Sequence, residues 1–162
     1  MNRRAFIGAG ALVALGAGGF VAADGQNLFY TAITEDFPGG ILSAPDAHAK
    51  ATAGEIILID IRRPDEWEKT GSGEGAHRID LRIPDFAAQV QAAAGGDLAA
   101  PVALICARGV RSARTSNQLI NAGFTNIIDV PEGMLGSASG PGWLERGLPL
   151  VHEDYTPPGS NT

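Results

Sequence analysis

The most informative segment of the chain reads Pro101-Val102-Ala103-Leu104-Ile105-Cys106-Ala107-Arg108-Gly109-Val110-Arg111-Ser112. Its first five residues form a short apolar run, typical of a buried strand. Residues 111–122 have helical spacing, and Gly123 follows where a C-terminal cap is expected. The segment therefore predicts a strand, a tight loop and a helix. Cys106 stands at the end of the strand, where open α/β folds place their ligand sites.

The segments on either side repeat this alternation of strand and helix. Apolar runs at residues 56–59 and 126–130 predict two more buried strands. Capping residues and early prolines predict further helices. These helices are expected from Ser43 to about Ala53, from Pro64 onward, over residues 84–94 and over residues 143–146. Buried strands separated by helices indicate an α/β fold with a mostly parallel sheet.

Composition excludes several classes of protein. The chain has 162 residues, of which 44% are hydrophobic and 19% charged, so it is expected to be globular with one domain of ordinary size. A formal charge of −6 argues against nucleic acid as a partner, since that binding needs clustered Lys and Arg. A single cysteine excludes an internal disulfide framework and a four-cysteine zinc site. We expect neither a metal nor a cofactor.

Residues 1–23 have the composition of a secretory signal. Arg3 and Arg4 precede an uncharged apolar stretch, and small residues at positions 21–23 resemble a cleavage site. The paired arginines also resemble the twin-arginine signal of bacteria. We therefore expect a periplasmic or exported protein, delivered by the twin-arginine or the general secretion route. The alternative is a retained membrane anchor, the one case in which a membrane is a partner.

The rest of the chain divides into three parts. Residues 24–40 lack sustained periodicity and end in a turn at Pro38-Gly39-Gly40, so they are expected to connect the signal to the domain. The domain covers residues 41–150, and a loose, polar and proline-rich tail covers residues 151–162. Cleavage after Ala23 would remove two arginines and no acid, which takes the formal charge from −6 to −8.

Cys106 combines several features of a reactive thiol. Backbone amides in the turn before a helix can converge into an anion-binding nest, and Gly109 permits the dihedrals that such a turn needs. The amides, together with Arg108, Arg111 and Arg114, favour the thiolate. No histidine stands in an obvious position to act as a base. The alternative is that Cys106 is a small buried core residue.

Several segments resemble, in one order and spacing, the motifs of rhodanese (sulfurtransferase) domains. The active loop of that family is similar to Cys106-Ala107-Arg108-Gly109-Val110-Arg111-Ser112, and its first motif to Ile57–Arg62 with Pro64–Trp67. Ala122–Ile127 and Glu132–Met134 resemble the segments that follow the loop. The resemblance covers residues 41–150. It implies a rhodanese-like α/β domain whose central, mostly parallel sheet is flanked by helices on both faces.

The resemblance also implies a reaction. Cys106 would attack the outer sulfur of a small anionic donor such as thiosulfate and hold it as a persulfide. Cyanide or a thiol, on a small molecule or a protein, would then collect the sulfur. Backbone amides of the loop would stabilise the persulfide anion, and two arginines would hold the oxyanion end of the donor. The residues expected to bind substrate are Ala107, Arg108, Gly109, Val110 and Arg111.

Asp60 and Arg62, at the end of the first motif, have two alternative roles. They would either brace the active loop from the neighbouring strand or only pack and pair. One segment departs from the family pattern: Gly71-Ser72-Gly73-Glu74-Gly75-Ala76 stands where Gly-His-Ile-Pro-Gly-Ala is common. We therefore expect the rim of the site to differ from that of the family. The same glycines imitate a dinucleotide fingerprint, but residues 77–84 read as extended chain, which excludes a nucleotide site.

Two other functions compete with sulfur transfer. A phosphatase or arsenate reductase of related architecture resembles Cys-x5-Arg, whereas Cys106 and Arg111 are separated by only four residues. The shorter loop leaves less room for a phosphate above the sulfur. The second competitor is a carrier or binding module that holds sulfur at Cys106 without turnover.

Overall fold

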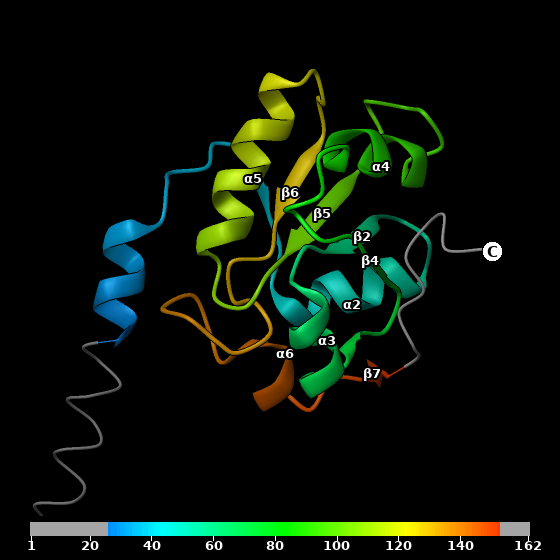
Figure 1. The fold of residues 1–162 in the computed structure, drawn as a ribbon. Coiled ribbons are helices and arrows are strands. Elements are labelled where there is room, and N and C mark those ends of the chain that lie inside the picture. The colour runs from blue at the N-terminus through cyan, green and yellow to red at the C-terminus, as the bar shows by residue number, and fades with distance from the viewer. Residues whose placement is uncertain (1–25, 153–162) are drawn as a thin grey trace, which may run out of the picture.

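The computed structural model describes residues 26–152, and Figure 1 shows their arrangement. A central sheet is covered by helices, as the alternating pattern predicts. The strands are β1 (Gly40–Ile41), β2 (Ile57–Asp60), β3 (Ser72–Gly73), β4 (Ala76–Arg78), β5 (Val102–Ile105), β6 (Ile127–Asp129) and β7 (Leu150–Val151). The helices are α2 (Ala44–Thr52), α3 (Pro64–Thr70), α4 (Phe86–Ala93), α5 (Val110–Asn121) and α6 (Gly142–Glu145).

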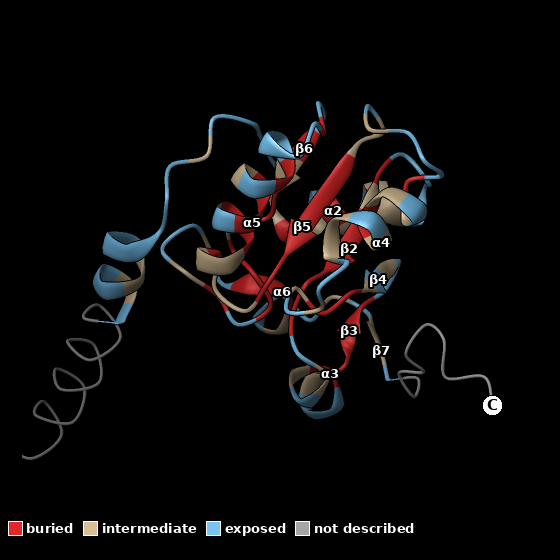
Figure 2. Ribbon diagram, turned by 45° about the horizontal axis from the view of Figure 1, so that its top comes forward, coloured by how far each residue is buried: buried red, intermediate tan, exposed pale blue. Residues whose placement is uncertain are grey.

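The main sheet has five strands in the order β1-β6-β5-β2-β4, and every neighbouring pair is parallel. A second sheet pairs the short strands β3 and β7 antiparallel. Figure 2 shows β5 as a buried strand in the middle of the main sheet. The predicted α/β fold with a mostly parallel sheet is therefore confirmed. Because β5 is central, the residue after it lies at the carboxyl edge of the sheet, between the ends of β2 and β6.

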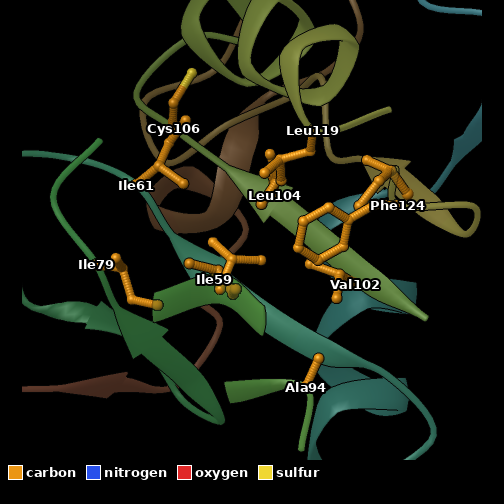
Figure 3. Close-up of a cluster of buried hydrophobic side chains, with 11 residues drawn as sticks. Ile59, Ile61, Ile79, Ala94, Val102, Leu104, Cys106, Leu119 and Phe124 are labelled. Atoms are coloured by element: carbon orange, nitrogen blue, oxygen red, sulfur yellow. The ribbon is translucent and has the colours of Figure 1, made fainter. Parts of the chain in front are cut away.

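Side chains of β5 alternate between two hydrophobic cores. Val102 and Leu104 face the core under α4 and α5, part of which is drawn in Figure 3. Ala103 and Ile105 face the core under α2 and α6. The period of two along the strand therefore gives the sheet two buried faces, each covered by helices.

The predicted helices and strands begin and end within about two residues of their observed limits. Ser43 caps α2, since its hydroxyl accepts a hydrogen bond from the Asp46 amide at 3.3 Å. Gly123 follows α5 with φ +101°, a conformation that glycine adopts without a steric cost. Residues 77–84 contain no helix, and β4 covers their start.

The segment before the domain departs from expectation in two ways. Residues 26–33 are helical, seen in blue in Figure 1, where an irregular connection was expected. Leu28 and Phe29 on this helix are 72% and 60% exposed, so its apolar residues do not form the buried stripe that reveals a helix in sequence. Gly40, expected in a turn, belongs instead to the edge strand β1.

Two predicted segments fall outside the part of the chain that the structure describes. These are the signal at residues 1–23 and most of the tail at residues 151–162. Within residues 26–152, no helix has the length and apolar character needed to cross a membrane.

Candidate active site at Cys106

Cys106 lies directly after β5, and its side chain is 1% exposed. In Figure 3 its sulfur points away from the rest of the labelled cluster, toward the loop that precedes α5. The Sγ atom donates to Ser112 Oγ at 3.6 Å, within range for a sulfur donor. Cys106 also lines a pocket, so its sulfur is both packed into the core and reachable from one side.

The carbonyls of the loop are bound by neighbouring backbone. Cys106 O accepts from the Met134 amide at 2.8 Å, and Ala107 O accepts from the Leu135 amide at 2.9 Å. By contrast, none of the amides of residues 107–111 donates a hydrogen bond within residues 26–152. The carbonyls are thus bound on one side, while five consecutive amides stay available. This arrangement is suited to an anion.

Two glycines allow the loop after β6 to pack against the Cys106 loop. Gly109 has φ +83°, and a Cβ there would lie 2.5 Å from the Pro131 carbonyl oxygen. Gly133 has φ +65°, and a Cβ there would lie 2.5 Å from the Ala107 carbonyl oxygen. In both cases a side chain would meet backbone, which cannot move aside easily. The shape of the amide loop therefore depends on both glycines.

A pocket of about 340 Å³ opens above Cys106. Its polar end has the loop and two arginine side chains, and its remaining walls are apolar or aromatic. The lining residues are Tyr30, Ile33, Cys106, Ala107, Arg108, Val110, Arg111 and Leu135. Two of them, Tyr30 and Ile33, come from the helix at residues 26–33. The segment expected to be only a connection therefore forms a wall of the site.

Arg111 reaches across the site to α3. Its two terminal nitrogens donate to Glu66 at 2.8 and 2.7 Å, a two-pronged pair. Burial of Glu66 opposes its ionisation, but hydrogen bonds from Arg111 and from the Arg63 amide hold its pKa below the ordinary value. Arg111 therefore presents a fixed and partly neutralised cation to the pocket.

Arg108 and Arg114 have different surroundings. Arg108 lies over the Tyr30 ring, 5.3 Å from its centroid, and donates to the Gly136 carbonyl at 3.1 Å. Arg114 is 69% exposed, pairs with Glu35 and does not line the pocket. Of the three arginines near Cys106 in sequence, the structure brings Arg108 and Arg111 to the pocket.

Asp60 and Arg62 form a buried ion pair at the end of β2. They are 0% and 1% exposed, and a nitrogen–oxygen distance of 2.7 Å joins them. Arg62 also donates to Thr70 Oγ1 and to the Gly71 carbonyl, while Ser72 donates to Asp60. These hydrogen bonds join β2 to the end of α3 rather than to the Cys106 loop. Among the described residues, the hydrogen bonds of this pair therefore do not reach residues 106–111.

Sequence reasoning missed four neighbours of the loop: Tyr30, Glu66, Ser112 and Asp129. Ser112 ends the motif and had a signal in its spacing, six residues after Cys106. Glu66 lies in the first turn of a helix, where an acid is common because it interacts favourably with the helix dipole. Its position therefore did not indicate a site residue. Asp129 ends an apolar strand and is buried, at 3% exposed. No local pattern marks Tyr30.

Neither a histidine nor a metal cluster belongs to this site. None of the three histidines lines the pocket, and His48 pairs with Glu74 at 2.8 Å. Across residues 26–152 there is no group of three or more His, Cys, Asp or Glu side chains that could hold a metal ion.

Comparison with known proteins identifies relatives of this arrangement. The model of the Rhodanese-like domain family matches residues 43–138, more than half of the chain. A tRNA uridine(34) hydroxylase of Chlamydia abortus is 30% identical over 123 residues, covering 72% of this chain but only 36% of the hydroxylase. The chain thus spans about a third of that relative.

Two solved structures share the fold. The polysulfide-sulfur transferase homodimer of Wolinella succinogenes aligns over 91% of this chain and 98% of its own, with TM-score 0.55 and 24% identity. A thiosulfate sulfurtransferase of Pseudomonas aeruginosa aligns over 72% of this chain and 21% of its own, with TM-score 0.54 and 24% identity.

Proposed function

Since the chain belongs to the rhodanese-like domain family, we propose that it is a sulfurtransferase with Cys106 as its nucleophile. One observation carries the proposal: the cysteine stands beside five consecutive amides that have no partner within residues 26–152. Arg108 and Arg111 line the same pocket. A nucleophile beside such a set of donors fits chemistry that creates an anion on the cysteine itself.

The proposed reaction has two steps. The Cys106 thiolate attacks the outer sulfur of a donor such as thiosulfate, the sulfur–sulfur bond of the donor breaks, and sulfite leaves with the bonding electrons. Cys106 then holds a persulfide anion above the amides of residues 107–111. In the second step cyanide or a thiolate attacks the terminal sulfur, and the Cys106 thiolate leaves.

The loop favours sulfur transfer over phosphoryl transfer for two reasons. Cys106 and Arg111 are separated by four residues, one fewer than in the phosphatase pattern. In addition, Arg111 gives both terminal nitrogens to Glu66, so its fork is not free to clasp a phosphate. A persulfide does not need the arginine in this way, because the backbone amides can donate hydrogen bonds to its single terminal sulfur.

The mass of the protein after exposure to donor tests the proposal. The purified chain is incubated with thiosulfate or polysulfide, and the intact mass is recorded beside that of Cys106→Ser. We expect one added sulfur atom on the wild type and none on the variant. If neither donor adds sulfur to the wild type, the proposal is contradicted. Phosphate release from an aryl phosphate would favour the phosphatase alternative.

Addition of cyanide separates an enzyme from a carrier. Repeated thiocyanate formation at a catalytic amount of protein indicates turnover. A single equivalent, followed by no further product, indicates a carrier that gives its sulfur to a dedicated acceptor. The test is needed because an intact loop is required for turnover but does not guarantee it.

We also propose that the protein acts outside the cytoplasm, from the composition of residues 1–23. N-terminal sequencing of protein recovered from a periplasmic fraction tests this. A new N-terminus near Asp24 supports export with cleavage, and an intact Met1 in the membrane fraction supports the anchor. Recovery of the uncleaved chain from the cytoplasm would contradict both.

A further inference from the structure

A buried carboxylate next to Ser112 has no role in the reaction as described. Asp129 ends β6 on the same face of the sheet as Ile127, which belongs to the core under α4 and α5. It is 3% exposed, and its Oδ1 atom has no hydrogen-bond partner within residues 26–152. A buried polar atom without a partner is costly, so its presence calls for an explanation.

Ser112 stands between this carboxylate and the cysteine. Its hydroxyl accepts from Cys106 Sγ at 3.6 Å and donates to the Gly109 carbonyl at 3.0 Å. The same hydroxyl can instead turn its proton toward Asp129, where it favours the ionised form. Ser112 has one proton and three neighbouring acceptors: the Gly109 carbonyl, the Asp129 carboxylate and, once Cys106 ionises, its sulfur. The charge on Asp129 therefore influences where that proton points.

Among residues 26–152, no cation lowers the pKa of Asp129. On α5, Arg111 is paired with Glu66 and Arg114 with Glu35. Strands β1 and β5 contribute no titratable side chain, and Cys106 follows β5. After β6, the next acid is Glu132, which is paired with Arg146. Burial accordingly raises the pKa of Asp129 to about 6, and the Ser112 hydroxyl and the backbone at Val130 offset the effect only in part.

We propose that Asp129 is a positioning residue for Cys106 and acts through Ser112. When Asp129 is neutral, the Ser112 hydroxyl is free to donate to the sulfur anion. When Asp129 is ionised, it takes that hydroxyl as its own donor and adds a like charge behind the sulfur. The consequence for sulfur transfer rests on the proposed function, because the persulfide is the anion that would lose the hydroxyl donor.

Alkylation of Cys106 with iodoacetamide tests the inference without any sulfur donor. The reagent attacks the sulfur anion, and Cys106 is the only cysteine in the chain. Rates are compared between the full-length wild type and Asp129→Asn, which has nearly the same shape and remains neutral. We expect the ratio of variant to wild-type rate to be near one at pH 5 and to rise at least about threefold by pH 8.

Two further variants complete the experiment. In Asp80→Asn, a matched buried carboxylate that pairs with Arg82 is neutralised, and the ratio should stay flat, because the pKa of Asp80 is held below its ordinary value. In Ser112→Ala, the hydroxyl is absent. The ratio of the wild-type alkylation rate to that of Ser112→Ala should therefore be larger at pH 5 than at pH 8. This second comparison also carries the test if Asp129→Asn does not fold.

The outcomes separate the inference from the proposed function. A ratio for Asp129→Asn that stays flat or falls from pH 5 to pH 8 would show that Asp129 has only a structural role. Equal ratios of wild type to Ser112→Ala at both pH values would exclude the route through Ser112. Failure of the proposed function appears instead as the absence of added sulfur by mass, whatever the alkylation rates.

Discussion

Arg111 of α5 and Glu66 of α3 are joined by two hydrogen bonds of 2.8 and 2.7 Å at the edge of the Cys106 pocket. The pair connects the helix that begins at the amide loop to a helix 45 residues earlier in the chain. Its side chains are 32% and 18% exposed, so water screens it only in part. The pair thereby fixes a cation at the point where an anionic donor would enter.

Removal of the Arg111 charge should slow reaction with anionic donors. In Arg111→Met the pocket loses its fixed cation and keeps the Glu66 carboxylate, which repels the donor. We expect kcat/KM for thiosulfate to fall about tenfold or more. Arg114→Met, which removes a charge outside the pocket, should change it less than about twofold.

A double variant identifies the source of that loss. In Arg111→Met with Glu66→Gln the uncompensated carboxylate is gone, so part of the activity should return. An equal kcat/KM in Arg111→Met and Arg114→Met would show that Arg111 does not act on the donor.

Two ion pairs of the same local form differ in burial and in the further hydrogen bonds that one of the arginines donates to Thr70 and Gly71. Asp60 with Arg62 and Asp80 with Arg82 share the same Asp-x-Arg spacing and the same bonds from the arginine Nε and backbone amide. Arg62 is 1% exposed, whereas the Arg82 side chain is 57% exposed. Arg62→Ala leaves a buried, unpaired carboxylate and should cost about 3–5 kcal/mol of unfolding free energy.

The matched change Arg82→Ala should cost less than about 1 kcal/mol, because water can replace the lost partner. Urea unfolding of both variants measures the difference. Similar losses in the two variants would mean that neither the burial of Arg62 nor its further hydrogen bonds add to the stability of the fold.

Gly109 should be irreplaceable for a steric reason as well as a conformational one. Gly109→Ala adds a Cβ that would meet the Pro131 carbonyl oxygen at 2.5 Å, in addition to the strain of φ +83°. Gly95→Ala is the control, since its φ is +64° and nothing lies within 4 Å of a Cβ there. We expect the control to lose about 1 kcal/mol of stability and to keep its activity.

Gly109→Ala should lose more stability than this control and form persulfide at least tenfold more slowly, since the amide loop must shift away from Pro131. Intact mass after a timed exposure to thiosulfate measures the rate. Equal behaviour of the two variants would show that the close approach of Pro131 does not shape the loop.

The features predicted from sequence are those that local patterns encode. The apolar run before Cys106, the glycine after it and the helix from Val110 lie within about twelve residues, so strand, turn and helix follow from short-range preferences. The pairing of Arg111 with Glu66 depends instead on how α3 and α5 pack on the sheet. Asp129 was hidden for the same reason, because its place beneath Ser112 follows from the register of β6 beside β5.

Asp129 should make the stability of the fold depend on pH. Its pKa is raised from an ordinary 3.8 to about 6, so the folded state holds a proton that the unfolded state releases at lower pH. The stabilisation relative to the unfolded chain is therefore complete below about pH 4 and is lost as the pH rises through 6. The side chain at this position does not titrate in the variant Asp129→Asn. The free energy of unfolding of the variant, relative to that of wild type, should therefore rise by roughly 2–3 kcal/mol from pH 4 to pH 7.

Urea unfolding of wild type and variant at the two pH values measures this change. The difference between the proteins isolates Asp129 from other acids, such as Glu66 and Asp80, whose pKa values are lowered and whose effect has the opposite sign. A difference that does not change with pH would show that Asp129 is not protonated in the fold at pH 4 to 6.

Tyr30 should influence which donors the pocket accepts. Its ring lies against Arg108 and forms the apolar wall together with Ile33 and Leu135, so a donor with an aromatic group has more to contact than thiosulfate. Tyr30→Ala should raise KM about tenfold for an aromatic thiosulfonate and less than about threefold for thiosulfate, where only the support of Arg108 is lost. Tyr30→Phe keeps the ring and should resemble wild type with both donors. Equal losses with the two donors would mean that Tyr30 acts on Arg108 alone and that the wall does not contact the donor.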